Sequence, residues 1–318
     1  MRDTIKKLSV ITTVLLLAGC TGGAGEVPST GILLKNELSS ELMQPGGTVL
    51  LRTSVNNFFD NELKDAEGKL IRSFGQLNID PQQKQTIGTV QANPNATART
   101  QWTLDVRESA LDGTEFTNKV RLCFQYEQTA WHELAVVNSF EIESAVNSGT
   151  ETGPLKISFS GLETPYIKNE QVNSKIPISI SIKNNYVGYV ADNTGVDMSK
   201  DTIPYVDFIE VRIYDDNVSP HFAVIDDFTN PSSCETGFKD CFVCEPGHSS
   251  TDGESYIKCT ADDLSVFGDE TFLGTKLDVI TEAPYPEELI QTVEVTATYY
   301  YCVESSEFTL TVFTPGGN

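Results

Sequence analysis

Basic residues, histidines and long apolar runs are scarce in this sequence, and each scarcity excludes a class of function. The 22 lysines and arginines stand against 45 aspartates and glutamates, and the net charge at pH 7 is −23. A chain this acidic repels phosphate backbones, so we expect no nucleic acid among its partners. After the first 20 residues no run is apolar enough to cross a membrane, because a spanning helix needs about 20 apolar residues.

Motifs of catalysis are also missing. Only three histidines occur, and neither His132 nor His221 has a serine or cysteine in a nucleophile turn beside it. There is no Gly-x-Ser-x-Gly sequence and no glycine-rich phosphate loop. We therefore expect a protein that is not an enzyme.

The first 20 residues read as an export signal. Basic residues precede an apolar core from Leu8 to Ala18, which is too short to span a bilayer. Leu17-Ala18-Gly19-Cys20 resembles the lipobox of prokaryotic lipoproteins. The resemblance implies cleavage of residues 1–19 and a lipid on Cys20, and hence an extracytoplasmic protein anchored at the cell surface. The alternative is an ordinary signal peptide cut nearby. Residues 20–30 are expected to form a flexible tether.

The rest of the chain alternates apolar and polar residues with a period of two, which is typical of half-buried strands. Turn formers such as Pro45-Gly46-Gly47 and Asp112-Gly113 separate these runs. The pattern predicts an all-β fold of two tandem immunoglobulin-like β-sandwiches. The expected divisions are a first sandwich over 31–145, a linker over 146–153, and a second sandwich over 154–318 with an insertion at about 215–275.

The two halves look like a repeat. Ser54-Val55-Asn56-Asn57 matches Ser181-Ile182-Lys183-Asn184, and the strand Val120–Tyr126 matches Val295–Tyr301. On these features the chain resembles tandem immunoglobulin-like modules of archaeal and bacterial surface proteins, including CARDB-type adhesion modules. The strand from Lys119 to Thr129 resembles one found in surface lipoproteins of archaea. The resemblance implies surface structure or adhesion and no particular ligand.

The cysteines of the second half admit two readings. In an oxidising exterior, disulfides are expected. A tetrahedral zinc site is the alternative, formed by Cys234, Cys241, Cys244 and His248, with Cys259 paired to Cys302 or replacing one ligand. Either role would be structural. Cys123 stands alone in the first half and is expected to be reduced, with an intermolecular disulfide as the alternative.

Three short polar motifs suggest further sites. Asp192, Asn193 and Asp197 are expected to lie in a solvated turn, and weak calcium binding is the alternative. Asn95 and Asn217 begin glycosylation sequons in turn-rich stretches.

Taken together, these features predict a cell-surface lipoprotein with an adhesive, envelope-structural or partner-binding role. We expect it to contact the membrane through its lipid and to bind other envelope or surface proteins. The alternative is a sensory lipoprotein that binds a solute or a metal.

Overall fold

The computed structural model describes residues 31–72, 77–78, 84–93, 95–172, 175–191, 205–215, 222–227, 243–248, 255–265, 270–280 and 283–314. These residues form strands and turns without a helix, so none of them lies in a helix long and apolar enough to span a bilayer. The strands are β1 (Ile32–Leu38), β2 (Leu42–Met43), β3 (Thr48–Asn57), β4 (Leu63–Arg72), β5 (Leu77–Asn78), β6 (Lys84–Val90), β7 (Ala98–Val106), β8 (Glu115–Val137), β9 (Ser148–Thr150), β10 (Leu155–Ser160), β11 (Tyr166–Ile167), β12 (Lys175–Asn184), β13 (Tyr189–Ala191), β14 (Tyr205–Asp215), β15 (Phe222–Asp227), β16 (Val243–His248), β17 (Ser255–Ser265), β18 (Glu270–Val279), β19 (Glu288–Glu304) and β20 (Phe308–Val312).

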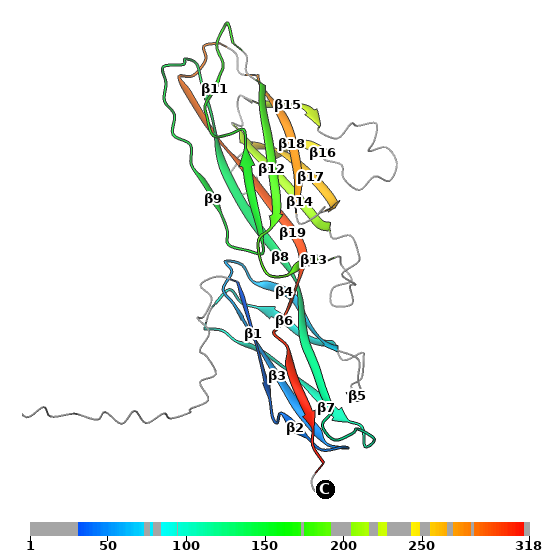
Figure 1. Ribbon diagram of the computed structural model, residues 1–318. Coiled ribbons are helices and arrows are strands. Elements are labelled where there is room, and N and C mark those ends of the chain that lie inside the picture. The colour runs from blue at the N-terminus through cyan, green and yellow to red at the C-terminus, as the bar shows by residue number, and fades with distance from the viewer. Residues whose placement is uncertain are drawn as a thin grey trace, which may run out of the picture.

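Two β-sandwiches lie end to end, as the sequence predicts (Figure 1). One sheet of the first sandwich has the strand order β1-β3-β7-β5, and one sheet of the second has the order β10-β12-β18-β15. The remaining described strands belong to a third sheet that serves both sandwiches, with β8 and β19 side by side at its centre. We call this third sheet the shared sheet.

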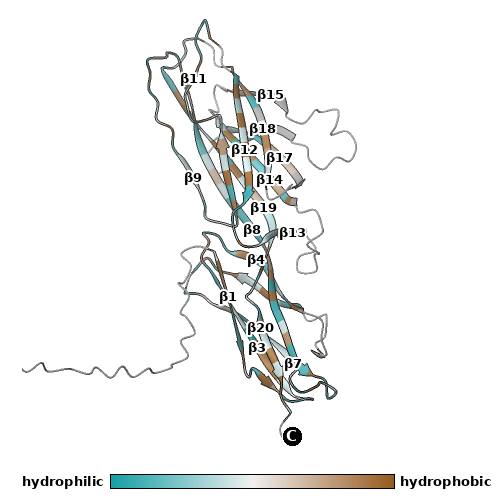
Figure 2. Ribbon diagram, in the orientation of Figure 1, coloured by the Kyte–Doolittle hydropathy of each residue, from teal (hydrophilic) through white to brown (hydrophobic). Residues whose placement is uncertain are grey.

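Strand β8 runs through both sandwiches. Apolar and polar residues alternate along much of it (Figure 2). Its even-numbered side chains from Phe116 to Val136 are buried, apart from the half-buried His132. Phe116 and Val120 pack in the first sandwich, whereas Ala130 and Leu134 pack in the second. Both smaller sheets therefore cover the same face of the shared sheet.

The division of the chain differs from the one expected. Strand β20 (Phe308–Val312) pairs with Glu115–Asn118 of β8, so the last described strand belongs to the first sandwich. The second sandwich is thus inserted between β8 and β20, and the chain enters and leaves it along neighbouring strands. Residues 146–153, expected to be a linker, contain β9, which pairs with Ala130–His132 of β8.

The expected insertion at 215–275 also needs correction. Its described residues form β15, β16, β17 and the start of β18, and all of these pair within the sheets of the second sandwich. Buried side chains such as Cys259, Ala261 and Leu264 explain why: this stretch contributes to the core. The described part is therefore sandwich rather than appendage.

An aromatic cluster, which we call the waist, joins the two sandwiches. Phe59 packs against Tyr126 in a tilted arrangement and against Tyr186 edge to face, with ring centroids 5.5 and 5.3 Å away. The Tyr186 hydroxyl, from the second sandwich, accepts a hydrogen bond from the Ile32 amide (2.9 Å) and donates one to the Ile32 carbonyl (3.0 Å). Tyr299 and Tyr301 complete the waist from β19. One hydrophobic core is continuous through this junction.

Candidate ligand-binding surface

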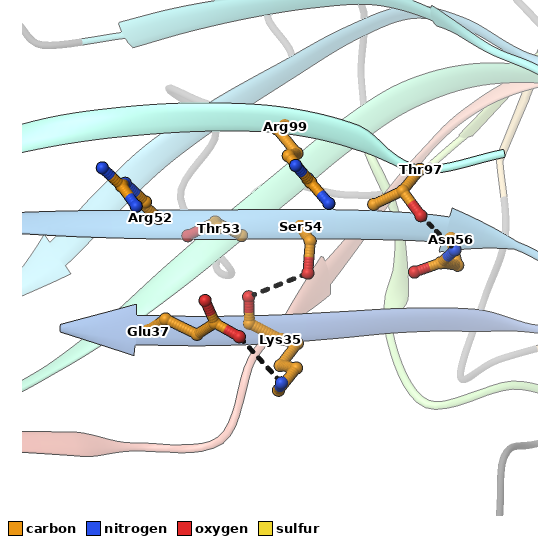
Figure 3. Close-up of a pocket in the computed structure, with 8 residues that line it drawn as sticks. All are labelled: Lys35, Glu37, Arg52, Thr53, Ser54, Asn56, Thr97 and Arg99. Carbon is orange, nitrogen blue, oxygen red and sulfur yellow. Dashed lines mark hydrogen bonds and ion pairs between the residues drawn. The ribbon is translucent and has the colours of Figure 1, made fainter.

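A shallow basic trough of about 300 Å³ lies on the outer face of the first sandwich (Figure 3). It is formed by three adjacent strands or their ends, and its lining residues are Lys35, Glu37, Arg52, Thr53, Ser54, Asn56, Thr97 and Arg99.

The alternation of β3 creates this surface. Leu51, Thr53 and Val55 are buried, so Arg52 and Ser54 between them face outward. The strand register then aligns the neighbours in rows across the sheet. Lys35, Ser54 and Arg99 form one row, and Glu37, Arg52 and Gln101 form the next.

A partly buried chain of hydrogen bonds supports the floor of the trough. The Thr53 hydroxyl donates to Asn36 Oδ1 at 2.7 Å, and Asn36 Nδ2 donates to Ser305 Oγ at 2.8 Å. Ser305 is buried and lies between β19 and β20. The turn that returns the chain to the first sandwich therefore helps to hold the trough in place.

Polar contacts arrange the side chains above this floor. Lys35 Nζ lies 2.7 Å from Glu37 Oε1, Arg52 Nε donates to Gln101 Oε1 at 3.3 Å, and Asn56 Nδ2 donates to Thr97 Oγ1 at 2.9 Å. The guanidinium of Arg99 forms no hydrogen bond or ion pair with a described residue, and Figure 3 shows it extending over the trough.

The trough is positive although the chain is strongly acidic. It carries three cationic side chains and one carboxylate. The hydrogen bond and charge of Lys35, with the charges of Arg99 and Arg52, lower the pKa of Glu37 below its ordinary value. Glu37 thus stays ionised and meets only part of the positive charge. Two arginines and several hydroxyl and amide groups suit an anion that bears carboxylate or sulfate groups.

The structure corrects the expectations for two cysteines. Cys123, expected to be reduced, forms a disulfide with Cys302, 179 residues away in sequence. Cys302 is therefore neither a partner of Cys259 nor a zinc ligand. The two cysteines face each other on β8 and β19, which the tandem division placed in different domains.

Cys259 is also disulfide-bonded, so it does not serve as a thiolate ligand of zinc. Its neighbour across the β16–β17 ladder is Cys244. Cys234 and Cys241 lie outside the described residues, as do the side chains of Cys244 and His248. No cluster of histidine, cysteine and carboxylate side chains in the described part of the chain could hold a metal. The zinc prediction stays untested.

The other expected sites are placed as follows. Asn95 is exposed in a turn two residues before Thr97, which lines the trough, and its amide donates to Asn93 Oδ1 at 2.9 Å. Its modification stays a prediction. Cys20, Asp192, Asn193, Asp197, Asn217 and His221 lie outside the described residues. His132 packs against Phe159 and its Nδ1 lies 2.6 Å from the Glu133 carbonyl, without a nucleophile among its described contacts.

Comparisons with known proteins add little. No family model matches the chain, and no curated protein matches it. Among solved structures, the collagen adhesin from S. aureus aligns over 89% of this chain and 93% of its own, with 11% identity and a TM-score of 0.15.

Proposed function

We propose that this chain is a non-enzymatic cell-surface protein that attaches to an anionic ligand through the basic trough. The observation that carries the proposal is the concentration of Lys35, Arg52 and Arg99 around one exposed carboxylate, on a chain with a net charge of −23. The positive charge of the trough attracts an anion to this face, whereas the acidic rest of the protein surface repels it.

The surface location is part of the proposal. It is supported by the Leu17-Ala18-Gly19-Cys20 sequence and by the disulfide bonding of Cys123, Cys259 and Cys302, because disulfides persist in oxidising compartments. A lipid on Cys20 would hold the sandwiches at the membrane surface. Replacement of Cys20 with serine should release the protein from the membrane fraction, and retention there would contradict this anchor.

A short acidic sugar tests the trough itself. Binding of trigalacturonate should be measured calorimetrically, with maltotriose as the neutral control. Arg52→Gln and Arg99→Gln should each weaken trigalacturonate binding by at least about tenfold, since a hydrogen bond to a charged group contributes about 1.5–3 kcal/mol. Lys64→Gln is the matched control. Lys64 pairs with Glu127 on the shared sheet, so this substitution removes one positive charge at a site away from the trough. Equal binding by all variants would refute the proposal.

A further inference from the structure

We propose that the anionic ligand is an acidic polysaccharide that extends from the trough across the waist to a second basic surface, formed by Lys156 and Lys183. The inference rests on the proposed function and adds to it the class of ligand and the second half of its site.

The second surface is built by two lysines that face each other across a ladder. Lys156 on β10 pairs in register with Lys183 on β12, and both side chains are exposed. Neither forms a salt bridge with a described residue. On the other side of β12, Glu270 of β18 stands opposite Lys183 and accepts a hydrogen bond from the Ser181 hydroxyl at 2.7 Å, so the row carries two positive charges and one negative charge. Like charges directly opposite each other on neighbouring strands destabilise a sheet. An anion bound between the two lysines would relieve this repulsion.

The trough and the lysine pair lie on the same side of the shared sheet. Both smaller sheets pack on the face of β8 that presents its even-numbered residues, from Phe116 to Val136. The outer faces of the two smaller sheets therefore both point away from the shared sheet, on the same side of it. A single long ligand can therefore reach both.

They also lie close to the waist, one on each side of it. Asn56 and Lys183 each stand one residue before the asparagine that ends its strand. These asparagines, Asn57 and Asn184, make equivalent turn contacts, and Asn184 accepts a hydrogen bond from the waist residue Tyr301 at 2.7 Å. The repeat thus places a ligand-facing side chain at the same point of each sandwich.

The composition of the second outer face favours a sugar chain over a protein. Serines at alternate positions cover its centre, namely Ser158, Ser160, Ser179 and Ser181. Lysine and serine are depleted in protein interfaces, which use aromatic and arginine anchors. Hydroxyl groups and ammonium groups instead match the hydroxyls and carboxylates of an acidic polysaccharide. The exposed ring of Phe272, opposite Ser181, offers an apolar platform for the C–H face of a sugar ring.

The net negative charge of the chain does not prevent such binding. On the outer face of the shared sheet, cations are already neutralised by acids, as in the Arg121–Glu304 pair at 3.1 Å and the Lys258–Glu210 pair at 3.0 Å. This face lies across a two-layer sandwich, and sheets pack about 10 Å apart. An anion on the basic side therefore lies more than about 10 Å from these acids, and salt in the surrounding solvent screens exposed charges beyond about 8–10 Å.

The test measures binding of the full-length ectodomain to polygalacturonate of about 20 residues. Lys156→Gln/Lys183→Gln should weaken binding by at least tenfold and reduce its salt dependence, because fewer counterions are released. Lys175→Gln/Lys64→Gln is the matched control. Lys175 lies on the same face of β12 at its far end, and the double substitution removes the same charge. Its affinity should stay within about twofold of the unmodified protein.

Two further arms separate failure of this inference from failure of the proposed function. If Arg52→Gln and Arg99→Gln weaken binding but the Lys156/Lys183 variant does not, the trough stands and the extended site is wrong. If polyglutamate of equal length binds as tightly as polygalacturonate, the polysaccharide class is wrong. If the unmodified protein does not bind polygalacturonate at all, both proposals are wrong.

Discussion

Asparagine residues at matching positions show how the repeat works at the residue scale. Asn57 Nδ2 donates to the Asn61 carbonyl at 2.8 Å, and its Oδ1 accepts from the Phe59 amide at 3.0 Å. Asn184 repeats both contacts, with Gly188 at 2.9 Å and Tyr186 at 3.3 Å. The sequence match predicted equivalence of these residues. The turn contacts explain it, because each asparagine closes the turn that delivers an aromatic ring to the waist.

Asn184→Ala should therefore destabilise the protein. The substitution removes the hydrogen bonds of Asn184 to the Tyr186 amide, the Gly188 carbonyl and the Tyr301 hydroxyl, although the Tyr301 hydroxyl keeps its hydrogen bond to the Tyr186 carbonyl at 3.1 Å. A polar group left unsatisfied costs about 1–3 kcal/mol. Urea denaturation would measure the loss, which we expect at about 2–4 kcal/mol in total. Asn185→Ala is the matched control, since Asn185 is the exposed neighbour. Equal stability of the two variants would contradict the role of the turn.

Tyr126 makes the waist sensitive to alkali. Burial raises the pKa of its hydroxyl well above the ordinary value, and the charges of Asp60 and Glu151 act in the same direction. The unfolded tyrosine ionises at about pH 10, so it loses its proton before the folded one does. Stability from this group is complete below pH 10 and falls above it, by about 1.4 kcal/mol per pH unit.

Tyr126→Phe should consequently flatten the fall of unfolding free energy above pH 10. The lost hydrogen bonds to Asn61 and Thr152 lower stability at every pH, so the change in slope isolates the ionisation. Denaturation curves at pH 8, 10 and 11 supply the measurement. An unchanged slope would show that Tyr126 does not govern the alkaline limit.

Cysteine pairing could not be read from the sequence because partners lie far apart along the chain. Cys123 and Cys302 are separated by 179 residues and meet only when β8 and β19 align. A disulfide that closes so long a loop stabilises by about 5 kcal/mol in the chain-entropy model. This alignment of β8 with β19 cannot be derived from the composition of the chain or from the spacing of its cysteines.

Register also predicts the partner of Cys259. Cys244 stands directly opposite it on β16, and residues at such positions have Cα atoms about 4.5–5.5 Å apart, within the range of a disulfide. Peptide mapping of the non-reduced protein should recover a Cys244–Cys259 cross-link. That result would remove one thiolate from the proposed zinc set of Cys234, Cys241, Cys244 and His248. A zinc equivalent together with a different partner for Cys259 would contradict it.

At the scale of elements, β8 shows both the reach and the limit of sequence patterns. Alternation predicted a strand at Val120–Tyr126, which is confirmed. It did not predict that this strand continues to Val137, because Gln128 and His132 interrupt the apolar series at inward positions. Gln128 is 1% exposed and is satisfied there by the Glu151 and Leu155 carbonyls and by the Tyr299 hydroxyl. In the sequence alone, a polar residue at an inward position indicates the end of a strand, because the distant partners that satisfy it are not visible there.

The trough was missed for a related reason. Its cations lie singly on separate strands, at Lys35, Arg52 and Arg99, and no motif contains them. Their outward positions follow from the alternation, and basic residues are scarce enough to attract notice. Only the register between strands brings the three together.

Strand β20 should carry much of the stability of the first sandwich. Leu310 is fully buried in the cluster with Leu51, Trp102 and Phe116. Leu310→Ala should cost about 2–5 kcal/mol in unfolding free energy. Thr309→Ala, at the exposed neighbouring position, should change stability by less than about 0.5 kcal/mol. A small effect of Leu310→Ala would show that β20 is dispensable to the first sandwich.

At the scale of the whole molecule, the inserted arrangement changes which pieces can fold alone. A fragment over 31–147 contains everything that a tandem division assigns to the first domain. It lacks β20, however, and leaves the Phe116 end of β8 without its neighbour. It also exposes the waist residues Phe59 and Tyr126, which pack against the second sandwich. We expect this fragment to show no cooperative unfolding transition.

Restoring the missing strand should rescue it. Tyr126 on β8 pairs in register with Tyr299 on β19, so the two strands can be joined by a two-residue Asn-Gly turn. The resulting chain, 31–126 joined to 299–314, keeps the Cys123–Cys302 disulfide and β20 and omits the second sandwich. It should unfold cooperatively in urea, and Leu310→Ala in this background should abolish the transition. If the 31–147 fragment folds as well as the joined chain, then β20 is not a required part of the first sandwich and the two sandwiches are independent tandem units.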